Sequence, residues 1–278
     1  MAGRRRRRMG GAFVTVGLVG CVCLGAGGCS GGPRAAADDA PKGDAVEVLH
    51  RAADRLAEAG SSQARTSMEM ATGGTRVTIR GEGVYDYRRQ LGRLRVLLPQ
   101  DPAGPRRPIT ELLAPGALFM KNRGAGVPAD KWVRVDTATL SDGNLVTGGA
   151  TDPFVAAEVL RGTRRATYVG PTEVAGAQVR HYRGTADLAV AARRATTANR
   201  QALAAAAEGF ATTDVPFDAY LDDEGRIRKV RHRFSFVNGR QKGPVAVAST
   251  TLLFDFGTPV RVRLPEDEDI YAGRIAEE

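Results

Sequence analysis

The chain has 278 residues, of which 42% are hydrophobic, enough for a sizeable core in one large domain or two small ones. Its formal net charge is +9, but five of the 40 basic residues are the arginines at positions 4–8, and without them 35 basic residues face 31 acidic ones. The remaining charge of +4 is small, and no basic helix or aromatic platform follows. We therefore expect no binding to nucleic acid.

Cysteine and histidine are too few and too scattered for a disulfide framework or a metal centre. All the cysteines lie within the first 29 residues, at Cys21, Cys23 and Cys29. The rest of the chain therefore has no disulfide and no thiolate metal site. The histidines, His50, His181 and His232, lack ligand spacing, so we expect no metal and no cofactor.

Residues 1–28 have the layout of a secretory signal. The arginines at 4–8 give a positively charged start, residues 12–24 are an apolar segment too short for a membrane span, and small residues lead to Cys29. A cysteine at such a boundary is typical of bacterial lipoproteins, in which the thiol receives lipid and the chain is cut just before it. We predict a signal peptide over 1–28 and membrane anchoring through acyl chains on Cys29.

The choice of cysteine and the export route stay open. In the usual lipoprotein pattern, leucine is commonest three positions before the modified cysteine. Cys21 has Leu18 at that position, whereas Cys29 has Ala26. The chain after Cys21 stays apolar, whereas the chain after Cys29 turns polar at once, which favours Cys29. An uncleaved anchor helix is the remaining alternative. The arginine run also suggests twin-arginine export, although the hydrophobic pair expected after it is absent.

Three helices are predicted after a short linker. Residues 29–43 lack large apolar side chains and are predicted to be a flexible tether. A helix follows over residues 44–59, with Asp44 as its N-cap. A short helix begins at Asp152 and Pro153 and runs to residue 161, and a longer, alanine-rich helix spans residues 187–209.

Most of the remaining chain alternates apolar and polar residues with a period of two, which predicts strands. The predicted strands begin at Ser61 and continue through residues 75–87, 93–98, 111–114, 117–121, 131–136, 167–170, 177–184, 216–222, 226–237, 245–256 and 260–264. No βαβ alternation and no internal repeat is visible. The sequence therefore predicts one α+β domain over residues 44–278, built on a large curved antiparallel sheet.

Several segments, in consistent order, carry a resemblance to a known family. They are residues 131–136, 152–162, 168–170, 173–176, 181–188, 218–226 and 254–260 with Pro265. Their order resembles the LppX/LprG group of LolA-like lipoproteins, and the resemblance covers roughly residues 44–270. It implies an incomplete antiparallel β-barrel wrapped on its concave side by α-helices, with room between them for acyl chains. It also implies a lipid or lipidated ligand, bound at the outer face of the cytoplasmic membrane for transfer or sensing.

Apolar burial would be the physical basis of such a site, because each buried methylene contributes about 0.8 kcal/mol. The candidates for the lining are apolar and aromatic residues of the predicted strands, any of which could equally be plain core: Tyr85, Val96, Leu118, Met120, Trp132, Tyr182, Phe217, Leu221, Val230 and Phe234. On the strand at 226–237, the alternate residues Lys229, Arg231 and Arg233 form a basic row, expected to be solvated, with lipid headgroups as the alternative partner.

Two function classes remain open, and an enzyme is not expected. The first is a lipid-binding lipoprotein of the cell envelope, and the second is an envelope protein-interaction or sensor module on the same fold. The sequence has no nucleophile elbow and no phosphate loop, and its acidic pairs, such as Asp222 and Asp223, lie in a turn and a tail. We predict no catalytic residues, and a monomer whose partners are the membrane, a lipid or acylated ligand and an envelope protein.

Overall fold

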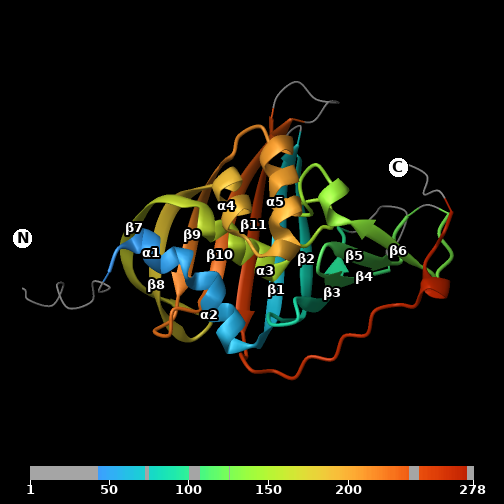
Figure 1. The fold of residues 1–278 in the computed structure, drawn as a ribbon, viewed down its shortest axis with the longest axis horizontal. Coiled ribbons are helices and arrows are strands. Elements are labelled where there is room, and N and C mark those ends of the chain that lie inside the picture. Colours follow the sequence, from blue (N-terminus) through green and yellow to red (C-terminus); the bar gives the residue numbers. More distant parts are fainter. Residues whose placement is uncertain (1–42, 73–74, 100–106, 125, 238–243, 274–278) are drawn as a thin grey trace, which may run out of the picture. The chain divides into compact units, whose positions relative to one another are not determined.

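One sheet of eleven antiparallel strands runs through the part of the chain that the structure describes (Figure 1). The computed structural model describes residues 43–72, 75–99, 107–124, 126–237 and 244–273. The predicted signal peptide, Cys21, Cys29 and nearly all of the tether lie outside these residues. The described residues belong to one compact unit. Within its described residues, no helix has the length and apolarity needed to span a membrane.

The strands pair almost entirely with their neighbours in sequence. Their order in the sheet is β6-β5-β4-β3-β2-β1-β11-β10-β9-β8-β7, so only the β1–β11 pair joins distant segments. The two edges, β6 and β7, do not pair with each other, and the sheet is an open half-barrel, which confirms the predicted fold class. The bounds are β1 (Ser61–Thr72), β2 (Thr75–Asp86), β3 (Leu91–Leu97), β4 (Ile109–Ala114), β5 (Ala117–Lys121), β6 (Trp132–Asp136), β7 (Thr163–Val174), β8 (Ala177–Asp187), β9 (Asp214–Leu221), β10 (Ile227–Val237) and β11 (Pro244–Phe254).

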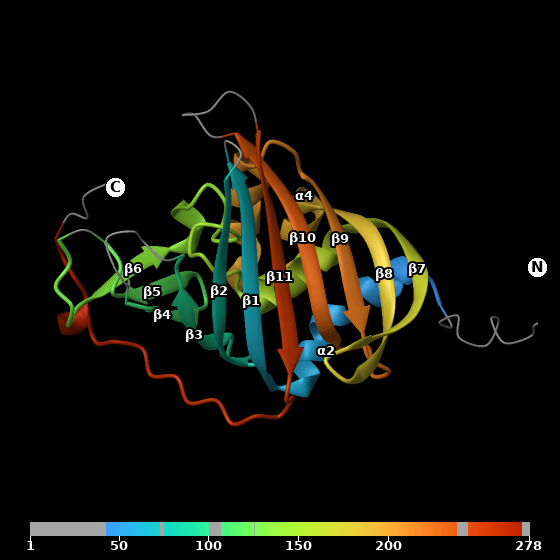
Figure 2. The same cartoon turned by 180° about the vertical axis from the view of Figure 1, so that it is seen from behind.

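The α-helices of the described residues cover one side of the sheet, as a comparison of the two views shows (Figures 1 and 2). They are α1 (Ala45–His50), α2 (Ala52–Ala59), α3 (Pro153–Val159), α4 (Leu188–Arg194) and α5 (Thr197–Gly209). The first and last predicted helices are each divided in two, at Arg51 and at residues 195–196. At the second break, the backbone N–H of Thr196 donates to the buried Glu158 carboxylate at 2.8 Å, so it is not available to continue the helix.

Side chains alternate between the two faces of each strand, as the sequence pattern predicts. In β3, Leu94 and Val96 are buried towards the helices, whereas Arg93 and Arg95 are exposed on the outer face. The short helix α3 is buried along its whole length between the sheet and the other helices. The buried apolar residues of sheet and helices form one cluster, so the core of the domain lies inside the half-barrel.

The predicted strand over residues 260–264 is wrong. This segment has no regular structure, and it runs from the end of β11 along the lower rim of the sheet to β6 (Figure 2). A strand could not form beside β11, because β1 and β10 already occupy both of its edges. Instead, Val262, Leu264 and Ile270 pack with outward-facing residues of β4–β6, and Tyr271 N–H donates to the carbonyl of Trp132 at 2.8 Å.

Gly143 marks the place where a buried loop touches α5, and it provides a stability test of the packing. Its φ is +56°, and a Cβ added there would collide with the carbonyl oxygen of Ala202 in α5. Gly116, in the β4–β5 turn, has a φ of +71° and open space around it.

We expect Gly143→Ala to lower the free energy of unfolding by about 3 kcal/mol or more, because backbone strain and a steric clash add together. Gly116→Ala, the matched control, carries the strain alone and should cost about 1 kcal/mol. Urea unfolding followed by circular dichroism measures both values. Equal losses in the two variants would contradict the close packing of this loop on α5.

Candidate functional site

The space between the sheet and the helices is the candidate functional site. The concave face of the sheet is apolar over most of its area, and α3 lies against it with Phe154, Ala157 and Val159 fully or almost fully buried. Small alanine side chains on α3, α4 and α5 bring the helix backbones close to their neighbours. The interior is therefore a layer of apolar side chains with helices above it and strands below it.

Most of the predicted lining residues lie together in this interior. Nine of the ten belong to the main core cluster, and none of them is more than 6% exposed: Tyr85, Val96, Leu118, Met120, Tyr182, Phe217, Leu221, Val230 and Phe234. Trp132 does not join them. It packs on the outer face of β4–β6, with the segment that follows β11, so it drops out of the proposed lining.

A row of polar side chains crosses this apolar face on β1, β11 and β10. Thr66 pairs with Thr251, and Ser249 pairs with His232, in the register of these adjacent strands. Above the row, the hydroxyl of Thr151 lies 2.6 Å from that of Ser249. The hydroxyls of Thr66 and Thr251 and the Nε2 atom of His232 are buried and have no hydrogen-bond partner within the described part of the chain. Groups of this kind lower stability, because they lose water without gaining a partner.

His232 lies in an aromatic environment. Its ring stacks on Phe234 at a centroid distance of 5.7 Å and meets the edge of Phe217 at 6.4 Å. Burial lowers the pKa of His232 to about 3, so the imidazole is neutral at neutral pH. A neutral imidazole offers one donor and one acceptor, and here its Nε2 atom faces an apolar interior.

Glu111 is a further buried polar residue of the interior, apart from the row on β1, β11 and β10. It lies on β4, opposite Leu94 of β3 and Met120 of β5, and it is fully buried. Neither carboxyl oxygen has a partner among the described residues. Burial raises the pKa of Glu111 to about 8, and the positive charge of Arg123 offsets only part of this shift. At neutral pH this side chain is therefore an uncharged acid with a proton to donate.

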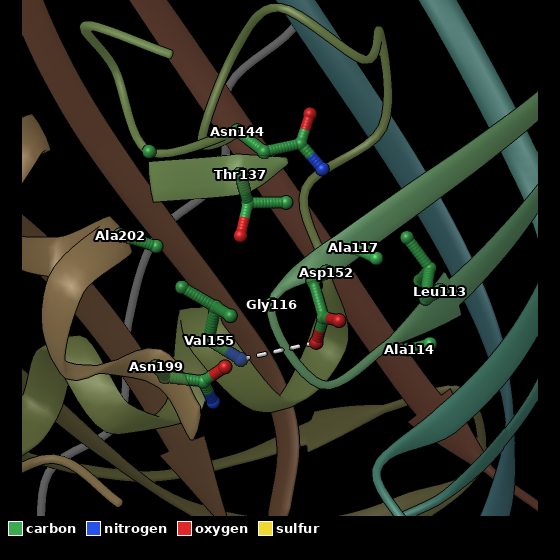
Figure 3. A pocket seen from close by; sticks show the side chains of 11 residues that line it. Leu113, Ala114, Gly116, Ala117, Thr137, Asn144, Asp152, Val155, Asn199 and Ala202 are labelled. Atoms are coloured by element: carbon green, nitrogen blue, oxygen red, sulfur yellow. Dashed lines mark hydrogen bonds between the residues drawn. The ribbon is translucent and has the colours of Figure 1, made fainter. Parts of the chain in front are cut away.

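A small pocket opens beside Asp152, at the start of α3 (Figure 3). One oxygen of Asp152 accepts from the backbone N–H groups of Phe154 and Val155, as predicted for a helix cap, and the other accepts from the Tyr85 hydroxyl at 3.1 Å. Burial raises the pKa of Asp152 to about 6, although these hydrogen bonds act to lower it. The cavity volume is about 10 Å³, room for about one water molecule and far too little for an acyl chain.

Polar contacts tie the helices to one another. The buried Glu158 of α3 accepts from Thr196 and from the Asn199 side chain of α5. Arg161, just after α3, donates to Asp54 of α2 at 2.6 Å. By contrast, the helices meet the sheet mainly through apolar side chains. The helices therefore form a linked layer on the concave face.

Sequence reasoning did not single out Glu111, Glu158 or the polar row as parts of the site. A signal for Glu111 was present, because Ile109 and Leu113 place it on the inward face of its strand by the period of two. Nothing comparable pointed to Glu158, which lies in a helix that is buried on all sides.

The sheet and the helices that cover its concave face define an open antiparallel half-barrel. No family model matches the chain, and no curated protein matches it. Among solved structures, it is similar to the lipoprotein LppX of Mycobacterium tuberculosis, at 9% identity and a TM-score of 0.44 over 78% of this chain and 99% of that one.

Two further solved structures are similar in fold. LprF of Mycobacterium bovis shares 14% identity at a TM-score of 0.38, over 79% of this chain and 96% of that one. A LolA-superfamily protein of Nitrosomonas europaea shares 11% identity at a TM-score of 0.34, over 77% and 95% of the two chains. LppX and LprF are of the group that the sequence resembles.

The buried acid at Glu111 predicts a pH-dependent stability. Between its usual pKa of 4.5 and its folded pKa of about 8, the folded chain holds a proton that the unfolded chain has lost, so stability falls as pH rises through this range. Glu111→Gln has nearly the same shape and no proton to lose. We expect it to match the unsubstituted protein near pH 4 and to be more stable by about 2–3 kcal/mol at pH 7.

Urea unfolding at a series of pH values measures this difference. Glu82→Gln removes an exposed carboxylate of the outer face and serves as the control, with no such growth expected between pH 4 and pH 7. A constant difference between Glu111→Gln and the unsubstituted protein over this range would contradict the raised pKa.

Proposed function

We propose that this protein is an extracytoplasmic lipoprotein that binds a lipid or lipidated molecule between the concave face of its sheet and its helices. The observation that carries the proposal is a set of buried polar groups that have no hydrogen-bond partner among the described residues, within a largely apolar interior. A core that serves only stability gains from apolar side chains at such positions, since each buried polar group without a partner costs about 1–3 kcal/mol. A ligand that carries polar groups would satisfy them.

A lipid has both apolar chains and polar groups, and it therefore matches the chemistry of this interior. Its chains would replace the apolar contacts made by residues such as Val230 and Phe217, and each methylene removed from water would contribute about 0.8 kcal/mol. Its ester or hydroxyl groups would supply partners for Thr66, Thr251 and His232. A fully apolar ligand would leave these groups unsatisfied, so we favour a ligand with a polar group close to its chains.

Binding would require movement of the helices, because the cavity beside Asp152 has room for only about one water molecule. The contacts favour movement of a linked layer. Glu158 and Arg161 join α2, α3 and α5 by charged hydrogen bonds, whereas the helices meet the sheet mainly through apolar contacts that acyl chains can replace. The ligand would then take the place of contacts between α3 and the sheet.

The proposed anchor is Cys29, with residues 1–28 removed. A flexible tether over residues 29–43 would have a mean reach of roughly 20 Å and a fully extended reach of about 45–50 Å. The domain would therefore stay close to the outer face of the cytoplasmic membrane, next to a source of lipid. We propose that it acts there as a monomer, in transfer or in sensing.

The packed interior favours a second candidate function. On this alternative, the same fold is an envelope protein-interaction or sensor module whose cavity has been filled by side chains. The two candidates differ in whether lipid accompanies the protein through purification.

Native mass spectrometry of residues 38–278, secreted without lipidation and purified without detergent, tests the proposal. We expect a bound lipid, and we expect Val230→Trp to lower the loaded fraction about fivefold or more, because the larger ring occupies the space of a chain. Thr250→Trp, on the outer face of β11, is the matched control and should load normally. A protein that is always empty, and that captures a membrane protein instead, would favour the interaction module.

His232→Phe separates loading from folding. Because it removes a buried polar atom without a partner, we expect the empty protein to become more stable by about 1 kcal/mol or more. Loading should nevertheless fall, since the ligand loses a hydrogen-bond partner. Normal loading of this variant would remove His232 from the proposed site.

The anchor has its own test in the full chain. We expect Cys29→Ser to abolish incorporation of a fatty-acid analogue and to release the protein from the membrane fraction. Cys21→Ser is the control and should be labelled normally. Label that persists in Cys29→Ser and vanishes in Cys21→Ser would show that Cys21 is the modified residue.

A further inference from the structure

The outer face of the sheet is bare over β1–β3 and β7–β11, where neither a helix nor the C-terminal segment covers it (Figure 2). Alternation along the strands directs many basic side chains to this face. Ten outward positions are basic, namely Arg65, Arg76, Arg80, Arg93, Arg95, Arg165, Arg183, Lys229, Arg231 and Arg233. Six are acidic, namely Glu69, Glu82, Asp86, Asp187, Asp214 and Asp218. We call this surface the outer basic face.

One buried carboxylate organises the β8–β10 half of the outer basic face. Asp218 accepts hydrogen bonds from His181 at 2.9 Å, from Arg183 at 2.9 Å and from Arg233 at 2.8 Å. Burial alone would raise the pKa of Asp218, but these three bonds outweigh it and lower the pKa to about 2. A single carboxylate thus holds two arginines in place, and the surrounding surface keeps an excess of positive charge.

The β2–β4 part of the same face contains an open hollow. Its volume is about 340 Å³, and it is lined by Arg93 and Arg95 of β3, with Glu82, Val84 and Thr110 around them. Its one carboxylate, Glu82, lies 4.0 Å from Arg95. This volume is far larger than the single-water cavity beside Asp152, so a hydrated phosphate group fits beside the arginines.

We infer that the outer basic face docks on the surface of an anionic membrane. A sheet face with spread-out cations and a hollow for a headgroup matches a layer of anionic phosphates, and each basic residue near such a surface contributes about 1 kcal/mol of attraction. Nucleic acid fits less well, because the aromatic rings there are already covered: His181 stacks on Tyr220 at 4.4 Å, and Arg65 lies over Phe254 at 4.7 Å.

This inference goes beyond the proposed function and does not depend on a lipid inside the half-barrel. It fixes which side of the domain meets the membrane, since the helices lie on the opposite side of the sheet (Figures 1 and 2). The two proposals can therefore fail separately. A protein that does not bind vesicles can still carry a lipid in its interior, and a protein with an empty interior can still bind vesicles.

Co-sedimentation of residues 38–278, which lack the proposed acyl anchor, with vesicles tests the inference. The vesicles are phosphatidylcholine, either alone or with a third of phosphatidylglycerol. In about 0.1 M salt we expect binding to the anionic vesicles only, and loss of that binding when the salt is raised to about 1 M, where the Debye length is about 3 Å.

Paired charge reversals locate the binding surface. Arg80→Glu with Arg93→Glu places two acids on the outer basic face and should weaken binding at least tenfold. Arg193→Glu with Arg200→Glu makes the same change in net charge on exposed residues of α4 and α5 and should bind like the unsubstituted protein. Should the first pair fail to fold by circular dichroism, Arg80→Gln with Arg93→Gln should still weaken binding at least threefold.

Three outcomes would overturn the inference. The first is equal binding to neutral vesicles, and the second is an equal loss of binding in both charge-reversed pairs. The third is that soluble glycerol phosphate or single-stranded RNA, at the same phosphate concentration, displaces the protein from the vesicles completely. That result would assign the face to a soluble phosphate or to nucleic acid instead of a membrane surface.

Discussion

Burial of the concave face of an open sheet is the constraint on which the rest of this structure depends. Eleven strands that do not close into a barrel leave a wide apolar surface on one side, and water would have to cover it unless another layer did. The five α-helices of the described residues supply that layer, although none is longer than 13 residues. Helices so short are not stable alone, so packing against the apolar face of the sheet stabilises them.

The polar groups of the interior are of two kinds, those that have hydrogen-bond partners and those that lack them. Asp152 is partly buried and Glu158 is buried, and both are well bonded, the first as the cap of α3 and the second as the link from α3 to α5. Glu111 and His232 are buried and lack partners within the described residues. The satisfied groups hold the helix layer together, while the unsatisfied groups lie on the strands beneath it, at the boundary where a ligand would enter.

The sequence predicted most of the strands, the residues that share one face of a strand, and the helix starts at Asp44, Asp152 and Asp187, because these depend on local periodicity and capping. Two features could not be predicted, because each depends on a partner that is distant in the sequence. The helix breaks at Thr196 because of Glu158, and residues 257–272 follow a path to the edge strand β6. The candidate site follows the same division. Nine apolar lining residues could be chosen from the alternation, whereas the absence of partners around Glu111 becomes visible only when strands and helices are assembled.

The two faces of the sheet have opposite chemistry, and one pattern in the sequence produces both. In β10, Val230, His232 and Phe234 face the helices, and Lys229, Arg231 and Arg233 face outward. A one-residue shift in register would bury the arginines and expose the core, so the cost of burying charge fixes the register of this strand. The same constraint that closes the apolar interior therefore also gathers the cations on the outer face. A domain folded in this way presents two different surfaces, one apolar and enclosed, the other basic and open, and the proposed lipid binding and membrane docking would use one each.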